Sequence, residues 1–570
     1  MARLDYFAPG VYVEEIDRGS RPIEGVQTNI AGFIGFTEDI RGGAEQFKPM
    51  LVTSWNQYLE YFGRPGSDGF TDFDAYLPFA VNGWFLNGGA RCWVISIGTQ
   101  LPGTPPPPPE QTALQIKSSS GNRPSLLFAL KPEETENGSV EVTILPGEPK
   151  STPEEDSDAP APVPAEFFTV VISRDREELE RHPNLTMNPQ IQAEVGDYVV
   201  TKLQESEFVT VTDLSQRGLP LARRPAEGQY EVSPPPMVPT PERLAREVQG
   251  VRDDRSGIQG LFEIDEITMI ACPDLMKAHQ VGLLDEDQLH GIMELMISLC
   301  ENAAPNPPNR MVILDPPHNR VKPQQVANWL DQDFNRRSMF AALYYPWIKV
   351  PNPRKAGKPI LVPPCGHMMG VWSRTDETRG VYKAPANETP RGVIGLAYDC
   401  NFREQELLNP KGINCIRTFP NRGIKIWGAR TLVEPDKTEW RYISVRRLMS
   451  YIEKSIELGT QWVVFEPNDE DLWARVRRTV SNFLERLWRE GALFGASPEQ
   501  AFYVKCDGDL NTPDTMILGR LYVEVGVCPV RPAEFVVFRI SQWNGPDEQW
   551  CCFFSSFFQG KELNPGVELW

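Results

Sequence analysis

The sequence predicts a multidomain protein of the α/β (α+β) class. Its 570 residues exceed the roughly 250–300 residues at which a single hydrophobic core stops growing. Short apolar runs of strand length alternate with amphipathic helical patterns in residues 26–100, 251–414 and 415–541. Between the first two of these parts, residues 101–250 are rich in proline and contain short β-type runs. We therefore expect several α/β parts and one β-rich insertion.

Residues 1–25 precede the first core-like pattern and are predicted to form an extended arm. Burying the five large apolar side chains between positions 6 and 16 would contribute roughly 10 kcal/mol, whereas ordering those eleven residues costs about 11–16 kcal/mol. The arm should therefore fold only when it adds a strand to an open sheet edge of another subunit. The residues expected in that inter-subunit strand are Val11, Tyr12, Val13, Glu14, Glu15 and Ile16.

In residues 26–100 the pattern indicates strands at Ile30–Phe36, Met50–Thr53 and Cys92–Ile97, with helices from Ser54 to Gly63 and from Tyr76 to Leu86. Residues 101–250 hold fourteen prolines between 102 and 164 and strand-like runs at Ser125–Leu130, Val140–Leu145 and Phe167–Ile172. Residues 251–414 return to alternating strands and helices, which predicts a middle α/β domain.

The C-terminal part, 415–541, is predicted to contain two amphipathic helices, stopped by Gly459 and Gly491, and two strands, Leu521–Val527 and Phe535–Ile540. We expect the second strand, with Phe535, Val537, Phe538 and Ile540, to accept an arm. Residues 542–570 form a C-terminal extension with an apolar run at Trp550–Phe558, which must dock either on a neighbour or on its own subunit.

The composition disfavours several function classes. A formal net charge of −20 repels phosphate backbones and anionic membranes, and no apolar run approaches the roughly 18 residues that span a bilayer. We therefore expect no nucleic acid partner, no direct membrane insertion, and assembly in the cytoplasm. The histidines have no metal-ligand spacing and no phosphate-binding loop of the GxxxxGK[ST] type is present, so we expect no metal and no cofactor.

Cys365 and His367 are the only cysteine and histidine close together in the sequence. A nucleophile beside a base is the minimum for thiol catalysis, which leaves a thiol hydrolase built on the middle domain as an alternative function. Two residues apart in a chain seldom provide that geometry, so a buried turn or helix start is the simpler interpretation, and we expect no enzyme.

Several segments resemble the contractile tail sheath proteins of phages and phage-tail-like injection systems. The resemblance covers about two thirds of the chain, with its segments in the family's order, and leaves out the proline-rich insertion and the last 25 residues. The segments that carry it are Tyr6–Glu15, Ile30–Gly35, Phe85–Val94, Pro363–Asp376, Arg379–Asn387, Asn421–Arg430, Arg441–Arg447 and Glu466–Asp469.

The resemblance implies a homo-oligomer of hexameric rings stacked around an inner tube, joined to a baseplate and a terminal cap, that contracts to drive the tube through a target envelope. It also implies that residues 26–100 and 415–541 fold together as an inner domain. A phage virion tail and a released or cell-anchored injection particle remain alternatives. The second C-terminal helix carries a polar stripe formed by Arg475, Arg478, Arg486 and Arg489. We hypothesise that this stripe faces the tube, and the simpler interpretation is a solvated helix face.

Overall fold

The computed structural model describes nine stretches of the chain. They are residues 22–101, 114–131 without positions 120 and 122, 140–148, 164–174, 177–191, 196–215, 219–232, 240–301 and 309–539. The predicted arm strand Val11–Ile16, Ile540 and the extension 542–570 lie outside the described residues. The chain divides into two compact units, 1–530 and 531–570, and the fold below is that of the first.

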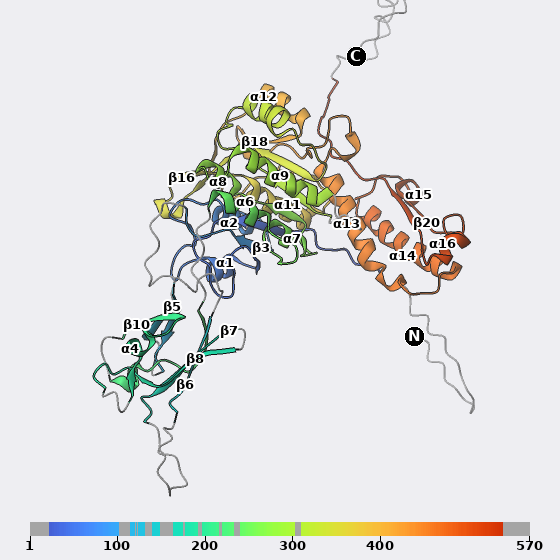
Figure 1. Cartoon of the computed structure of the whole chain (residues 1–570). Coiled ribbons are helices and arrows are strands. Elements are labelled where there is room, and N and C mark those ends of the chain that lie inside the picture. The colour runs from blue at the N-terminus through green and yellow to red at the C-terminus, as the bar shows by residue number, and fades with distance from the viewer. Residues whose placement is uncertain are drawn as a thin grey trace, which may run out of the picture. The chain divides into compact units, whose positions relative to one another are not determined.

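An eight-stranded sheet forms the centre of the first unit (Figure 1), in the order β19-β18-β14-β13-β12-β1-β3-β2. The six inner strands are parallel, and the two edge strands are antiparallel to their neighbours. Inner strands are almost wholly apolar because both of their faces are covered. The strands are β1 (Ile30–Gly35), β2 (Pro49–Val52), β3 (Arg91–Ser96), β12 (Met269–Ala271), β13 (Met311–Leu314), β14 (Ala341–Tyr345), β18 (Ile413–Phe419) and β19 (Gly423–Ile426).

The strand pairing in this sheet does not follow the predicted boundary between the inner and middle domains. Ala31 in β1 pairs with Met269 in β12, so the strands of 26–100 complete the sheet of the middle part. The contribution of the N-terminal part to the C-terminal core comes instead from Ile23, just before β1. The sequence pattern shows that β1 is buried on both faces, but it does not show which strands lie beside it.

Helices pack against this sheet and share its core, in which Trp84, Trp329 and Trp372 are among the largest buried side chains. The helices are α1 (Trp55–Phe62), α2 (Leu77–Leu86), α6 (Pro241–Gln249), α7 (Gly257–Phe262), α8 (Leu275–Gln280), α9 (Glu286–Glu301), α10 (Pro323–Asn328), α11 (Cys365–Arg379) and α12 (Phe402–Leu408). A small sheet of β15 (Ile348–Pro351), β16 (Pro359–Val362) and β17 (Gly395–Leu396) adjoins them.

Glycines allow α2 and α11 to cross at short range. A Cβ on Gly83 would lie 2.3 Å from the Nδ1 atom of His367, and one on Gly366 would lie 2.4 Å from the Cα of Ala80. Neither position has room for a larger residue, because the neighbouring atoms belong to a buried ring and to backbone. The contact therefore fixes the two helices relative to each other.

The insertion is built from two sheets around a core of its own that includes Phe128 and Phe168, and their strands are antiparallel except where β9 pairs in parallel with β8. One sheet contains β4 (Leu114–Lys117), β5 (Pro124–Leu130) and β10 (Val209–Asp213). The other contains β6 (Val140–Pro146), β7 (Phe168–Arg174), β8 (Glu177–Thr186), β9 (Asp197–Tyr198) and β11 (Gly228–Val232). Two short helices, α4 (Val199–Leu203) and α5 (Pro220–Arg223), complete it.

The C-terminal part of the first unit has a separate core, formed by the apolar faces of two long helices. Its elements are α13 (Ile443–Gly459), α14 (Glu470–Arg489), α15 (Pro498–Ala501), β20 (Phe502–Lys505), α16 (Pro513–Ile517) and β21 (Glu524–Val527). The predicted strand at 535–540 differs from the structure, because residues 531–539 form neither helix nor strand. A strand requires a ladder of backbone hydrogen bonds to a neighbouring strand, and none of the described strand pairings includes this segment.

No helix among the described residues is long and apolar enough to cross a membrane.

Candidate functional site

A buried ion pair joins the central and C-terminal parts next to the base of the predicted arm. Arg447 of α13 and Asp376 of α11 form this pair, with Nη1 to Oδ1 at 2.8 Å, and both side chains are only 6% exposed. The guanidinium also lies over the Trp372 ring, 5.0 Å from its centroid. Thr28 bridges the two partners, since its carbonyl accepts from Arg447 at 2.9 Å and its hydroxyl donates to Asp376 at 2.7 Å.

The residues just before Thr28 are bound to the C-terminal helices. Ile23 is buried in their core, and its carbonyl accepts a hydrogen bond from Arg486 of α14. The backbone N–H of Val26 donates to the hydroxyl of Ser455 at 3.2 Å. Residues 23–28 are therefore fixed to α13, to α14 and, through Thr28, to α11.

This junction leaves no local signal in the sequence because its members are far apart in the chain. Asp376 and Arg447 are separated by 71 positions, and Thr28 and Arg447 by 419. At 100° per residue Arg447 lies opposite the apolar stripe of Val445 and Leu448, so the helical pattern gave no signal that its side chain is buried. Only the tertiary contacts show that this charge has a buried partner.

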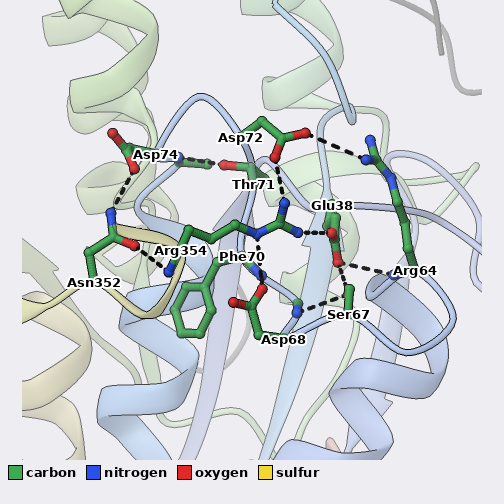
Figure 2. A network of polar contacts seen from close by, with 12 residues as sticks. Glu38, Arg64, Ser67, Asp68, Phe70, Thr71, Asp72, Asp74, Asn352 and Arg354 are labelled. Carbon is green, nitrogen blue, oxygen red and sulfur yellow. Dashed lines mark hydrogen bonds and ion pairs between the residues drawn. The ribbon is translucent and has the colours of Figure 1, made fainter. Parts of the chain in front are cut away.

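A second polar network fastens the loop between β15 and β16 to the segment after β1 (Figure 2). In this network the guanidinium of Arg354 contacts three carboxylates, those of Glu38, Asp68 and Asp72, and Nε lies 3.0 Å from Asp68. The Glu38 side chain is 1% exposed, and it also accepts from Ser67. All three acids contact the same guanidinium, and Asp72 also pairs with Arg64 at 3.5 Å, so the cluster serves to hold these loops together.

The structure places Cys365 and His367 in the core, where they do not form a catalytic pair. Cys365 begins α11, and its N–H donates to Asp315 at 3.1 Å. Burial and the adjacent Asp315 raise the pKa of the Cys365 thiol well above its ordinary value, which disfavours the thiolate. Burial lowers the pKa of His367 to about 4, and its ring faces Gly83. The thiol hydrolase interpretation therefore lacks both a nucleophile and access to solvent.

Two buried carboxyl groups, Asp274 and Asp315, follow β12 and β13 and have structural partners. Asp274 accepts hydrogen bonds from the backbone N–H groups of Phe36 and Leu77, at 2.7 and 3.0 Å. Burial raises the pKa of Asp274 to about 6 and that of Asp315 to about 7. Among the described residues, no group of three or more histidine, cysteine or acidic side chains is placed to hold a metal ion.

The four arginines predicted to face a tube lie on α14. Three of them have partners within the chain: Arg475 pairs with Glu466 at 3.3 Å, Arg489 pairs with Glu485, and Arg486 donates to Ile23. Arg478 is exposed and has no hydrogen-bond or ion-pair partner in the described part of the chain. Arg478 is therefore the arginine of the stripe without a partner in the described chain. That the stripe faces a tube stays a prediction.

The C-terminal region leaves apolar groups exposed to solvent, whereas groups of this kind are buried in the central part. The sheet of β20 and β21 has only two strands, so both of its outer edges lack a neighbouring strand in the described chain. In the second unit, Phe535, Val537 and Phe538 are 73%, 79% and 83% exposed. Unpaired edges and exposed apolar strand-forming residues are typical of surfaces that bind another chain.

A tight turn between α13 and α14 presents a further exposed aromatic side chain. Phe465 is fully exposed and has a φ of 69°, in the left-handed region that bulky residues avoid. Neighbouring contacts hold the turn, because Glu466 N–H donates to the Val463 carbonyl at 3.1 Å and Arg475 lies over the Trp462 ring. A strained backbone that carries an apolar group into solvent is a mark of a binding surface.

Comparison with known proteins identifies two consecutive domains. Residues 262–432 match the phage tail sheath protein central domain, and residues 436–542 match the phage tail sheath C-terminal domain. These two domains belong to the tail sheath family. The boundary between the two matched domains lies where the sheath chain leaves β19 and enters α13, so it coincides with the change from the central core to the C-terminal core.

Curated sheath relatives cover part of the chain. The tail sheath protein of Salmonella phage ViI is 30% identical over 173 residues, which is 30% of this chain and 26% of the relative. The tail sheath protein of Burkholderia phage BcepMu is 28% identical over 214 residues, 36% of this chain and 43% of the relative. The matched regions thus span less than half the length of these curated relatives.

Solved structures resemble the sheath chain over nearly its whole length. The helical sheath of the anti-feeding prophage in its contracted state has a TM-score of 0.54 at 22% identity, covering 94% of this chain and 100% of that one. The sheath of the extracellular contractile injection system PVC, also contracted, has a TM-score of 0.53 at 20% identity, covering 95% and 99%. At these identities the likeness shows a shared multidomain sheath fold.

Proposed function

We propose that this chain is the structural sheath subunit of a contractile injection machine, which polymerises as stacked hexameric rings around an inner tube and contracts to drive that tube through a target envelope. The observation that carries the proposal is the incomplete C-terminal part, with a two-stranded sheet and an exposed apolar segment at 535–538. The two matched tail sheath domains and the shared sheath fold support it.

Strand exchange would complete this part. Phe535, Val537 and Phe538 are exposed, and together with Ile540 they have the composition of a strand. The outer edges of β20 and β21 have no neighbouring strand in the described chain. Pairing across subunits would satisfy the backbone groups and bury the apolar side chains at once. Because the partner is a copy in a different position, such pairing generates an open helical assembly.

The N-terminal arm is proposed as the second link. Val11–Ile16 would add a strand to a neighbour, and the bonds at Ile23, Val26 and Thr28 fix the base of the arm to its own subunit. Rings joined in this way can shift and widen without separating. Contraction is then a change of packing within the lattice and requires no nucleotide at the sheath.

The partners proposed beside further copies of this chain are an inner tube, a baseplate and a terminal cap. The stripe of Arg475, Arg478, Arg486 and Arg489 is proposed to face the tube, with Arg478 as its free charge. Reversal of Arg478 to Glu should weaken co-assembly of tube and sheath. Unchanged co-assembly would contradict the assignment of this face, and Arg441→Glu, on the loop before α13, serves as the control.

The decisive experiment changes the exposed strand without touching a core. The triple variant Phe535→Ser, Val537→Ser, Phe538→Ser should keep the unfolding midpoint of the isolated chain and abolish long assemblies in negative-stain images. Deletion of residues 1–20 should leave folded monomers or single rings. Long sheaths formed by either variant would overturn the strand-exchange mechanism, while a wild-type chain that forms no rings or tubes would overturn the sheath function.

We propose assembly in the cytoplasm and a final place in a particle. The runner-up within this function is the tail of a phage virion, and capsid genes beside this one would favour it over an injection system. The thiol hydrolase alternative predicts selective labelling of Cys365 by a mild electrophile in a monomer, whereas a core cysteine should react only on unfolding.

A further inference from the structure

A cavity of about 350 Å³ lies at the carboxyl end of the central sheet, in the part that the sheath function leaves unused. Its wall includes Tyr345 and Trp347 around the end of β14, and Lys277 and Gln280 of α8. In open α/β sheets, ligands bind outside the carboxyl ends of the strands. A volume of this size also falls in the range of small-molecule sites.

The neighbouring crevice, where the strand order reverses between β1 and β12, is already occupied by the protein itself. Asp274 fills it and accepts hydrogen bonds from backbone N–H groups of three residues: Phe36, Tyr76 and Leu77. The space that remains open to a ligand is therefore the cavity beside α8.

Lys277 brings a positive charge to this cavity. Its ammonium group lies 5.4 Å from the centroid of the Tyr76 ring, and no carboxylate among the described residues is within ion-pair distance of it. Burial lowers the pKa of Lys277, although Asp274 and Asp74 at longer range oppose that shift. A half-buried cation without a direct counter-ion is stabilised when an anion binds beside it.

The other charges at the cavity are compensated within the chain. Arg320 pairs with Glu286 at 3.0 Å and with Asp333 at 3.2 Å. The Asp74 carboxylate accepts from Asn352 at 2.8 Å, a contact drawn in Figure 2, and it also pairs with Lys355. Lys277 is thus the cation of this cavity that an incoming anion would pair with.

His318 supplies a second polar group. It lines the same cavity, and its ring lies 5.7 Å from that of His279. A neutral imidazole can donate one hydrogen bond to an anion. Pro346 and Trp347 add apolar and aromatic surface, and Trp347 is held by a bond from its Nε1 to the carbonyl of Pro316 at 2.9 Å.

We propose that this cavity binds a small organic anion, a carboxylate or a phosphate monoester, whose charged group pairs with Lys277 and His318 and whose apolar body lies against Trp347. The site belongs to the central part and is independent of strand exchange. Binding there would stabilise the central sheet without requiring assembly.

The test uses the full chain at constant ionic strength, with benzoate and phenyl phosphate as probes and benzyl alcohol as the neutral analogue. Calorimetric titration should give saturable binding of at least one anion, and the same anion should raise the unfolding midpoint, because a ligand that binds the folded state stabilises it. Benzyl alcohol should do neither. Absence of saturable anion binding at millimolar concentration would overturn the proposal.

Two variants separate a specific site from general charge attraction. Lys277→Met keeps the aliphatic length, so the unliganded midpoint should stay or rise while anion affinity falls at least tenfold; Lys277→Arg should retain binding. Lys437→Met, an exposed lysine elsewhere, is the matched control and should bind as the wild type does. Equal affinity in Lys277→Met and wild type would overturn the site, as would inorganic phosphate binding as tightly as phenyl phosphate. His318→Phe gives a second test, with weaker binding expected.

Discussion

The central part and the C-terminal part of this sheath chain differ in how completely they bury their apolar side chains and pair their strands. In the central part, eight strands and their helices enclose Trp84, Trp329 and Trp372. The C-terminal part stops at two strands, with open edges, and Phe465 lies in solvent beyond α13. The first buries its apolar side chains within one chain, whereas the second leaves strand edges and apolar side chains exposed, and we propose that other chains cover them.

This difference predicts a division of mutational effects. Changes in the central part and at its junction should lower the stability of the isolated chain. Changes on the C-terminal surface should leave that stability unchanged or increased and should act on assembly. The following four predictions run from the largest expected effect on stability to the smallest.

Arg447→Ala should cost about 3–5 kcal/mol of unfolding free energy, because it leaves the Asp376 carboxylate buried without its partner. Denaturant unfolding followed by tryptophan fluorescence measures the loss. The matched control is Arg489→Ala, whose pair with Glu485 is exposed, and it should change stability by less than about 1 kcal/mol. Equal effects of the two variants would show that the junction does not hold the two parts together.

Asp315→Asn should change how stability depends on pH. The folded chain raises the pKa of this carboxyl from 3.8 to about 7, so the folded state holds the proton more tightly than the unfolded state. Its contribution is fully present below pH 4 and is lost as the pH rises towards 7. The stability of the variant relative to wild type should therefore increase across that window, by a few kcal/mol at about 1.4 kcal/mol per pH unit. A difference independent of pH would contradict the burial of this group.

Gly83→Ala should destabilise the chain by about 1–3 kcal/mol, because the new methyl group meets the buried His367 ring at the crossing of α2 and α11. Gly291→Ala is the matched control on α9, where a Cβ meets nothing within 4 Å. It should stabilise the chain by up to about 1 kcal/mol through helix propensity. Thermal unfolding of both variants measures the difference, and effects of the same sign would disprove the close crossing.

Phe465→Asn should raise the unfolding free energy slightly, by up to about 1–2 kcal/mol, because asparagine adopts the left-handed conformation more readily than phenylalanine. The same variant should reduce the yield of assembled sheaths, since it removes the exposed aromatic group. Phe402→Asn, at an exposed phenylalanine without such strain on α12, should leave assembly unchanged. If the Phe465 variant assembles normally, the strained turn has no role in assembly.

Sequence patterns alone determined the class of the fold and most of its elements. Apolar runs such as Met311–Leu314 and the helical spacing of Val445 to Ile456 depend on neighbours in the chain, so they can be read from it. The ordered segments from Ile30–Gly35 to Glu466–Asp469 also carried the family resemblance. The role of the stripe of arginines and of Val11–Ile16 stays a prediction.

The tertiary structure determined which segments of the chain are neighbours in space. The parallel pairing of β1 with β12 moved residues 30–96 into the central sheet, because parallel strands are joined by long crossovers that leave no local signal. It also brought Thr28, Asp376 and Arg447 together and placed Cys365 out of reach of solvent. Residues 535–538 have the pattern of a strand but form none in this chain, because a strand also requires a hydrogen-bonded neighbour, which we propose is another chain.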